Sequence, residues 1–308
     1  MSLAQATTAV APERASVAAA TRVVIKLGTS VVMRDDGAVA VGRLYSLIES
    51  IAALRRANRE VVLVSSGAVG LGVERLALPA RPTTLPMTQA CAAVGQSRLM
   101  ALYEHGFEHF GVVTAQVLLT EDDFTAPDRA RNLKATLTTL LSLGAVPIVN
   151  ENDAVATTEL ERPDSGTNAG APRRTIFGDN DKLSALVALP VAAELLLILS
   201  DVDGLYTAHP MRDPGARLVP TVRGAVPDVA PERAGARGRG GIVTKLEAAR
   251  IAMDARIPAV VANGREPHVI DRVCAGEVVG TVFLPADPAD PADMEQTPRG
   301  PRRAKRSA

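Results

Sequence analysis

Short apolar runs alternate along the chain with longer stretches in which apolar residues recur every three or four positions. The short runs are typical of buried parallel strands, and the spaced patterns are typical of amphipathic helices. We predict strands at residues 21–27, 60–64, 112–119, 145–149, 194–199, 258–262 and 280–284. We predict helices at residues 44–54, 87–110, 128–142, 181–189, 243–256 and 267–275.

This alternation predicts an α/β fold, a three-layer αβα sandwich around a mostly parallel sheet, in one domain at residues 21–285. We expect residues 1–20 to be a disordered N-terminal extension, because they are rich in Ala and Thr and are broken by Pro12. We expect residues 286–308, which are low in complexity, to be a disordered basic tail. Residues 157–176 are expected to form a long loop or loose hairpin beside the polar clusters described next.

Two clusters of acids and amides follow apolar segments. Asn150, Glu151, Asn152 and Asp153 come directly after a predicted strand, and the run Gly178–Asp181 opens a predicted helix. Open α/β sheets bind ligands at the carboxyl ends of their strands, and helix N-termini present free N–H groups. Such residues are also common in turns and helix caps, but two clusters together favour a site for a small polar ligand.

Composition narrows the class of protein. Of the 308 residues 47% are hydrophobic and only 3% aromatic, which suits an aliphatic core between strands and helices. Five of the last ten residues are basic, so residues 1–298 carry 29 basic and 34 acidic side chains. A mildly acidic body is not typical of a nucleic-acid binder, and no apolar run reaches the length of about 18–20 residues that spans a bilayer.

Cysteine and histidine give no sign of a metal centre. Cys91 and Cys274 are far apart in the sequence and form no CxxC motif, so we predict neither a disulfide framework nor a zinc site. His105 and His109 are four residues apart, but no HExxH motif surrounds them. We therefore assign no protein ligand to a metal.

Lysine is rare, with five residues against 29 arginines. Lys26 ends the first predicted strand, and Lys245 follows the glycine-rich run 238–241. A lysine is a mobile point charge suited to a phosphate in transfer, and glycines allow backbone N–H groups to approach phosphate oxygens. Taken singly, Lys26 could be an ordinary strand-end residue and Lys245 an exposed residue near a helix start. Neither a Walker A loop nor a GxSxG motif is present, and phosphoryl transfer to an ionised carboxylate needs no general base.

Seven short motifs occur in order: Lys26–Ser30, Ser65–Ala68, Gly95–Arg98, Asn150–Val155, Phe177–Asp181, Ser200–Tyr206 and Gly240–Lys245. In these motifs the chain resembles the glutamate 5-kinases of the amino acid kinase superfamily, in the form without a C-terminal PUA domain. The resemblance implies ATP-dependent phosphorylation of the γ-carboxylate of L-glutamate in the cytoplasm, the first step of proline biosynthesis. It also implies Mg²⁺ carried on ATP, proline as a feedback inhibitor, a glutamyl phosphate reductase as a possible partner, and a homo-oligomer.

The resemblance also implies roles for individual residues. The implied catalytic residues are Lys26, Asp181 and Lys245. The implied glutamate-binding residues are Ser66, Gly67, Asn150, Asp153 and Asn180. The implied ATP-binding residues are Lys26, Gly28, Thr29, Ser200, Asp201, Arg239, Gly240, Gly241, Ile242, Val243, Thr244 and Lys245.

Two alternatives stay open from the sequence. Another amino acid kinase substrate, such as acetylglutamate or aspartate, is one, although an acylated amine would leave Asp153 without a charge to pair with. A sensing module that binds without turnover is the other. Arg239 favours the sensor, because the family's loop usually reads Gly-Thr-Gly-Gly, whereas the paired lysines favour catalysis.

Overall fold

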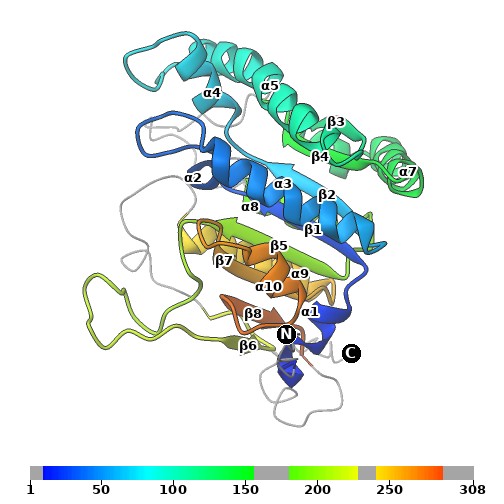
Figure 1. Cartoon of the computed structure of the whole chain (residues 1–308), viewed down its shortest axis with the longest axis vertical. Coiled ribbons are helices and arrows are strands. Elements are labelled where there is room, and N and C mark those ends of the chain that lie inside the picture. Colours follow the sequence, from blue (N-terminus) through cyan, green and yellow to red (C-terminus); the bar gives the residue numbers. More distant parts are fainter. Residues whose placement is uncertain (1–9, 156–179, 228–240, 287–308) are drawn as a thin grey trace, which may run out of the picture.

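The structure, a computed structural model, describes residues 10–155, 180–227 and 241–286. Within these ranges eight strands form one sheet in the order β3-β4-β2-β1-β5-β7-β8-β6 (Figure 1). The strands are β1 Arg22–Leu27, β2 Glu60–Ser65, β3 Thr114–Leu119, β4 Val146–Glu151, β5 Leu195–Ser200, β6 Thr221–Arg223, β7 Ala259–Asn263 and β8 Thr281–Leu284. Neighbouring strands are parallel except for β7 and β8, which run antiparallel.

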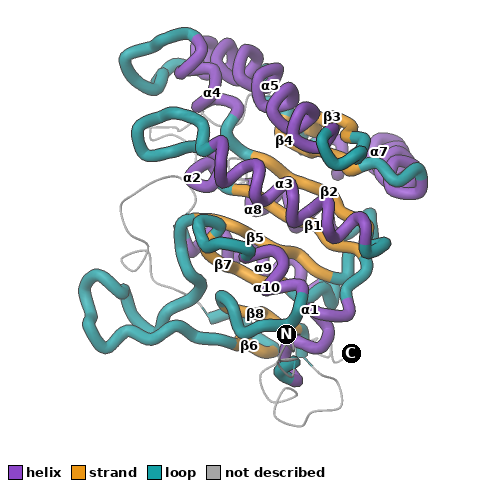
Figure 2. The backbone as a smooth tube through the Cα atoms, in the orientation of Figure 1, coloured by secondary structure: helices purple, strands orange, loops and turns teal. Residues whose placement is uncertain are grey.

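Helices cover both faces of this sheet (Figure 2). The larger helices of one face are α3 Val41–Arg56, α5 Leu85–Glu108 and α10 Val269–Cys274, and those of the other are α7 Pro127–Ser142, α8 Asn180–Ala188 and α9 Ile242–Asp254. Successive strand residues point to opposite faces, so Ile25 belongs to the buried cluster of α3 and α5, and Val24 to that of α8 and α9. The predicted three-layer α/β sandwich is confirmed.

Each predicted strand and helix is found, with ends that differ by no more than three residues. Not predicted were the short elements α2 Thr29–Val32, α4 Ala68–Arg75, α6 Asp122–Thr125 and β6. The sequence of α4 contains Gly70 and Gly72, which lower its intrinsic helix propensity, and β6 has only three residues. In the described ranges no helix is both long and apolar enough to cross a membrane.

The N-terminal segment differs from the expected disordered extension. Residues 12–19 form a 3₁₀ turn, Pro12–Arg14, and the helix α1, Ala15–Ala19. Arg14 is only 1% exposed, and its guanidinium donates to the carbonyl oxygens of Val279 (3.1 Å), Gly280 (3.1 Å) and Pro220 (3.0 Å). These acceptors lie more than 200 positions away in the sequence, so local composition could not reveal them. Residues 1–9, the 157–176 segment and the tail beyond residue 286 lie outside the described residues.

Helices α4 and α5 cross so closely that two positions require glycine. A Cβ atom on Gly95 would lie 1.7 Å from the carbonyl oxygen of Ala68, and one on Gly72 would lie 1.9 Å from that of Cys91. Backbone atoms cannot rotate out of the way as a side chain can. Because α4 begins directly after the end of β2, this crossing places α5 beside the carboxyl ends of the strands.

The carboxyl ends of the central strands meet at one edge of the sheet. Strand β1 lies between β2 and β5, and Leu27 is in register with Ser65 on one side and Leu199 on the other. On one side of β1 the sheet continues with β2 and β4, and on the other side with β5 and β7. In open α/β folds this reversal of strand order leaves a crevice for ligands.

We expect Gly95→Ala to lower the free energy of unfolding by about 1–3 kcal/mol or more, because the added methyl group forces two helix backbones apart. Urea unfolding measures the effect. Gly42→Ala is the matched control, since Gly42 lies in the exposed first turn of α3 and its added Cβ would meet nothing within 4 Å. That variant should be as stable as the wild type or slightly more stable. Equal stability of the two variants would show that the crossing can relax.

Candidate active site

Three charged side chains form a buried ion cluster at the carboxyl end of β1. The Asp181 carboxylate lies between Lys26 Nζ, 2.5 Å from Oδ1, and Lys245 Nζ, 3.0 Å from Oδ2. The exposed fractions are 3% for Lys26, 0% for Asp181 and 2% for Lys245. The structure thus brings the three predicted catalytic residues together from β1, α8 and α9.

Local structure explains how each member reaches the cluster. Lys26 follows Val24 on the face of β1 that is covered by α8 and α9. Asp181 lies in the first turn of α8, where the helix dipole favours a negative charge, and Lys245 lies in the first turns of α9. Thr244 Oγ1 donates to Asp181 Oδ2 over 2.8 Å and so ties the start of α9 to the same carboxylate.

Electrostatics keep Asp181 ionised. Burial alone would raise the pKa of its carboxyl group, but the charges of Lys26 and Lys245 and their hydrogen bonds outweigh burial and lower that pKa to about 2. At neutral pH the three side chains together carry one net positive charge. A buried site of that charge is suited to an anionic group such as phosphate.

A network of side-chain amides lies next to the ion cluster. The Asn180 amide nitrogen donates to Ser65 O (3.2 Å), Ser66 Oγ (2.9 Å) and Asn150 Oδ1 (3.0 Å). Asn180 Oδ1 is buried and accepts no hydrogen bond from the described residues. The Asn180 amide nitrogen thus already has partners, and the atom left open is an acceptor.

Gln96 on α5 extends this network and was given no role from the sequence. The Asn150 amide nitrogen donates to Gln96 Oε1 over 2.8 Å, and both side chains are buried. The sequence signal was its place in the motif Gly95–Arg98, one of the seven that carry the family resemblance. Without the α4–α5 crossing nothing indicated that it would face the end of β4.

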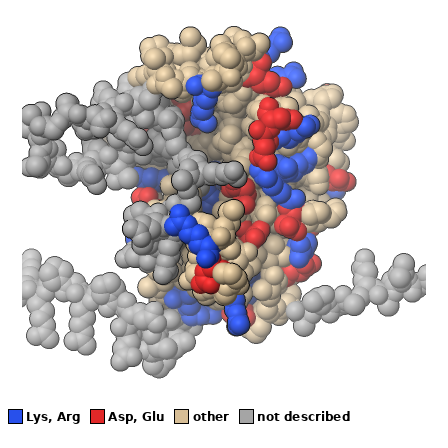
Figure 3. All heavy atoms as spheres, turned by 90° about the vertical axis from the view of Figure 1, so that its left-hand side faces the viewer, with Lys and Arg blue, Asp and Glu red and all other residues tan. Residues whose placement is uncertain are grey.

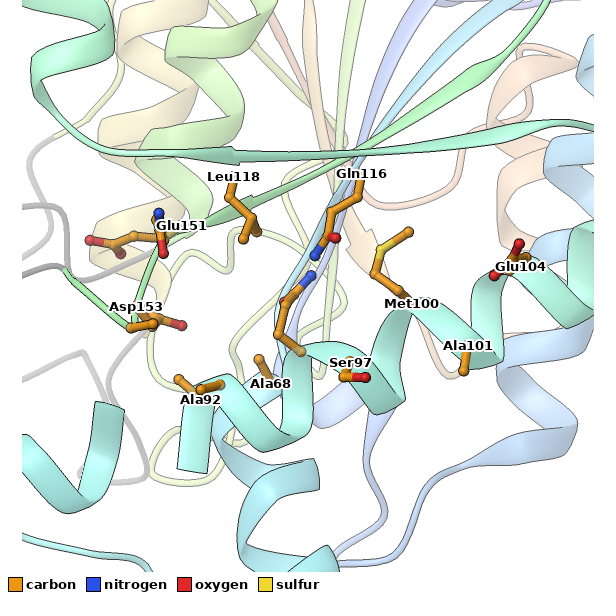
Figure 4. A pocket seen from close by; sticks show the side chains of 14 residues that line it. Ala68, Ala92, Ser97, Met100, Ala101, Glu104, Gln116, Leu118, Glu151 and Asp153 are labelled. Atoms are coloured by element: carbon orange, nitrogen blue, oxygen red, sulfur yellow. The ribbon is translucent and has the colours of Figure 1, made fainter. Parts of the chain in front are cut away.

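A cavity of about 510 Å³ opens beside these amides. In Figure 4 its walls are α5 and β3, from which Met100 and Gln116 point toward each other, and Glu151 and Asp153 lie at one end. Asp153 is half-buried in the turn that follows β4, so the structure places it at the cavity but not in the ion cluster.

The remaining predicted residues surround the ion cluster in part. Gly28 is tight against it, because a Cβ there would lie 3.6 Å from Lys26 Nζ and 3.3 Å from the Leu199 carbonyl oxygen. Ser200 is buried at the end of β5 and Asp201 is exposed beyond it. The other described positions lie at helix starts: Thr29 opens α2, Gly67 precedes α4 with φ of 110°, Gly241 precedes α9, and Ile242 and Val243 begin α9. Arg239 and Gly240 lie outside the described residues.

The surface at this end of the molecule carries both signs of charge. Figure 3 looks onto this end, and the described Lys and Arg side chains there lie among Asp and Glu side chains. Among the described residues no group of three or more His, Cys, Asp or Glu side chains could hold a metal ion. Both Asp181 oxygens already contact ammonium groups, so Asp181 is a poor candidate for a metal ligand.

The sequence profile of the amino acid kinase family matches residues 21–263. This chain belongs to the amino acid kinase family. It is similar to "Glutamate 5-kinase" of Geobacter sulfurreducens, with 44% identity over 267 residues that cover 86% of this chain and 68% of that protein. It is also similar to "Glutamate 5-kinase" of Listeria monocytogenes serotype 4a, with 43% identity over 265 residues, 85% of this chain and 92% of that one.

Two solved structures share the fold. The UMP kinase of Bacillus anthracis matches with a TM-score of 0.55 at 19% identity, over 86% of this chain and 96% of that one. The isopentenyl phosphate kinase of T. acidophilum matches with a TM-score of 0.56 at 17% identity, over 85% of this chain and 100% of that one. At such low identity these matches support the architecture alone.

We expect Asp181→Asn to lower the free energy of unfolding at pH 7 by about 3–5 kcal/mol, because it leaves two buried ammonium groups without their carboxylate. In the wild type the pKa of the Asp181 carboxyl group is about 2, below its unfolded value of about 3.9. The wild type loses this stabilisation as the pH falls from about 4 to 2, so the difference in stability between the wild type and the variant should shrink over that range. Urea unfolding at several pH values measures this difference.

The control for this experiment is Asp254→Asn, which removes an exposed carboxylate at the end of α9. It should change stability little and add no pH dependence. A loss in Asp181→Asn, relative to the wild type, that is the same at pH 5 and pH 2 would contradict an electrostatic origin.

Proposed function

We propose that this chain transfers the γ-phosphoryl group of ATP to the γ-carboxylate of L-glutamate and forms L-glutamyl 5-phosphate, the first step of proline biosynthesis. The observation that carries the proposal is the buried Lys26–Asp181–Lys245 cluster beside a network of amides. The relatives named glutamate 5-kinase, at more than 40% identity, support this choice of substrate within the family.

The chemistry needs positioning more than proton transfer. The γ-carboxylate of glutamate has a pKa of about 4.3 and is ionised at neutral pH, so it attacks without a general base. Its oxygen forms a bond to the γ-phosphorus while the bond to the β–γ bridging oxygen breaks, and ADP leaves. Lys26 and Lys245 stabilise the charge on the phosphoryl oxygens, and Asp181 positions both ammonium groups.

The nucleotide is proposed to lie over the carboxyl ends of β1 and β5. Gly28 gives room for phosphate beside Lys26, and the backbone N–H groups at the start of α9 are a ready anion site. The other residues proposed to contact ATP are Thr29, Ser200, Asp201, Arg239, Gly240, Gly241, Ile242, Val243 and Thr244. The described residues offer no dedicated magnesium site, so we propose that Mg²⁺ arrives on ATP oxygens and water.

Glutamate is proposed to occupy the cavity with its reacting carboxylate toward the lysines. Asp153, which lines the cavity, is the proposed partner of the α-ammonium group, and Asn180 is a further proposed contact of the substrate. Ser66, Gly67 and Asn150 complete the proposed glutamate contacts. An acetylated amine would lose the charge pair with Asp153, which disfavours acetylglutamate as the substrate.

The wider setting follows from this activity. We propose that the enzyme works in the cytoplasm as a homo-oligomer and that proline inhibits it. Acyl phosphates hydrolyse readily, so a reductase that takes up L-glutamyl 5-phosphate is the proposed downstream partner.

The direct test is turnover of ATP–Mg²⁺ with L-glutamate, N-acetyl-L-glutamate or L-aspartate, with hydroxylamine present to trap acyl phosphate as hydroxamate. We expect hydroxamate with L-glutamate and little with the other two acids. Hydroxamate formed mainly from another acid would keep the mechanism and overturn the substrate. ATP binding without turnover of any acid would favour the sensing module instead.

We expect Lys26→Gln and Lys245→Gln each to lower kcat by about 100- to 1,000-fold, because each removes one cation from the transferring phosphoryl group. Hydroxamate formation measures the rate, and urea unfolding checks that each variant is folded. Lys134→Gln, which changes an exposed lysine on α7, is the control and should keep the wild-type rate. Near wild-type turnover in either site variant would refute its role.

A further inference from the structure

Gln96 has a buried donor that the proposed reaction has not yet used. The side chain is 9% exposed and lines the cavity between α5 and β3. Its Nε2 atom is buried and makes no hydrogen bond with any described residue. Buried polar atoms in native proteins nearly always have a partner, so an unpaired amide N–H₂ group on a residue that lines a cavity points to a ligand.

The orientation of this amide is determined by its neighbours. The Glu151 backbone N–H donates to Asn150 Oδ1 over 2.9 Å, and a backbone N–H can only donate, so the oxygen of Asn150 must lie on that side. The Asn150 amide nitrogen therefore points the other way, toward Gln96 Oε1. Gln96 must accept there and is left with Nε2 as its open atom.

The other end of the amide network has the opposite polarity. The Asn180 amide nitrogen faces the Ser65 carbonyl oxygen, which can only accept, so Asn180 is left with an open oxygen. The network therefore presents an open acceptor next to the ion cluster and an open donor at α5. The open donor at α5 matches an anionic acceptor, such as the α-carboxylate of an amino acid.

The position of Gln96 indicates which carboxylate it meets. Asn180 is adjacent in sequence to Asp181 of the ion cluster, and from there the hydrogen bonds lead through Asn150 to Gln96. Gln96 is thus the member of the network farthest along the chain of bonds from the lysines. A substrate whose γ-carboxylate lies at Lys26 and Lys245 extends its other end toward Gln96 and Asp153.

We propose that Gln96 Nε2 donates a hydrogen bond to the α-carboxylate of the amino acid substrate and is a specificity-determining residue. The proposal rests on the function proposed above and adds a residue to it. A hydrogen bond to a charged group is stronger than one between neutral groups, and a substrate without that carboxylate leaves the buried N–H₂ group unsatisfied.

Gln96→Glu tests the proposal with a nearly isosteric change. The new carboxylate still accepts from Asn150, but its open atom changes from a donor to an acceptor. With ATP saturating at about pH 8.5, we expect the KM for L-glutamate to rise at least 10-fold and the KM for ATP to stay within twofold. The α-amide of L-glutamate carries N–H donors in place of the α-carboxylate, so its KM should rise much less. The preference for L-glutamate over this amide should therefore fall.

The pH dependence separates recognition from a merely structural role. Burial raises the pKa of a carboxyl group, and a protonated Glu at position 96 can still donate. In Gln96→Glu the KM for L-glutamate should therefore increase as the pH is raised from about 6 to 9, beyond any change in the wild type. A KM that is unchanged, or that rises equally for both substrates at every pH, would overturn the proposal.

Gln116→Glu is the matched control, because it makes the same substitution on the opposite wall of the cavity, on β3 (Figure 4). If both variants raise the KM for L-glutamate equally, a negative charge anywhere in the cavity explains the effect, and the proposal is overturned. If Gln96→Glu does not fold, Gln96→Met removes the donor instead and should bring the KM for L-glutamate close to that for its α-amide.

Failure of the proposed function gives a different result. In that case the wild-type protein forms hydroxamate from another amino acid, and the Gln96 comparison is made between that acid and its own α-amide. If the Gln96 variants no longer discriminate between that acid and its α-amide, the role of Gln96 is supported and the assignment of glutamate as the substrate is wrong. If the variants still discriminate between the acid and its α-amide, the proposed role of Gln96 is overturned as well.

Discussion

The placement of one carboxylate between two buried lysines is the constraint on which the rest of the site depends. Two ammonium groups cannot be buried side by side without an anion, and Asp181 supplies it from the first turn of α8. The cluster joins β1, α8 and α9, so the same charges that are proposed to act on phosphate also set the relative position of three elements. Structure and proposed chemistry are therefore coupled through a single side chain.

Next to the ion cluster, the amide network fixes which atom of each side chain donates and which accepts a hydrogen bond. Single hydrogen bonds between amides could be reversed, but the Glu151 N–H and the Ser65 carbonyl oxygen each allow only one orientation of their partner. As a result, the network leaves an acceptor open at one end, Asn180 Oδ1, and a donor open at the other, Gln96 Nε2.

Two glycines make this arrangement possible from the opposite layer. The α4–α5 crossing at Gly72 and Gly95 lets α5 approach the ends of β2 and β4, and Gln96 is the residue after Gly95. The site thus draws on both helical layers, with the ion cluster from α8 and α9 on one side and the amide donor from α5 on the other. Close packing of helix backbones, rather than polar contacts, controls where that donor lies.

The amino-acid sequence by itself determined the fold class and the boundaries of the main strands and helices, because apolar periodicity reports directly which face of each element is buried. The members of the ion cluster, Lys26, Asp181 and Lys245, were implied by the resemblance to the glutamate 5-kinases, whose motifs fall at strand ends and helix starts, where such folds bind ligands. The sequence did not reveal Arg14 or Gln96, whose partners are Val279 and Asn150, distant in the sequence. Only the tertiary structure decided these points, because whether a buried amide presents its nitrogen or its oxygen depends on which neighbours have already used the other atom.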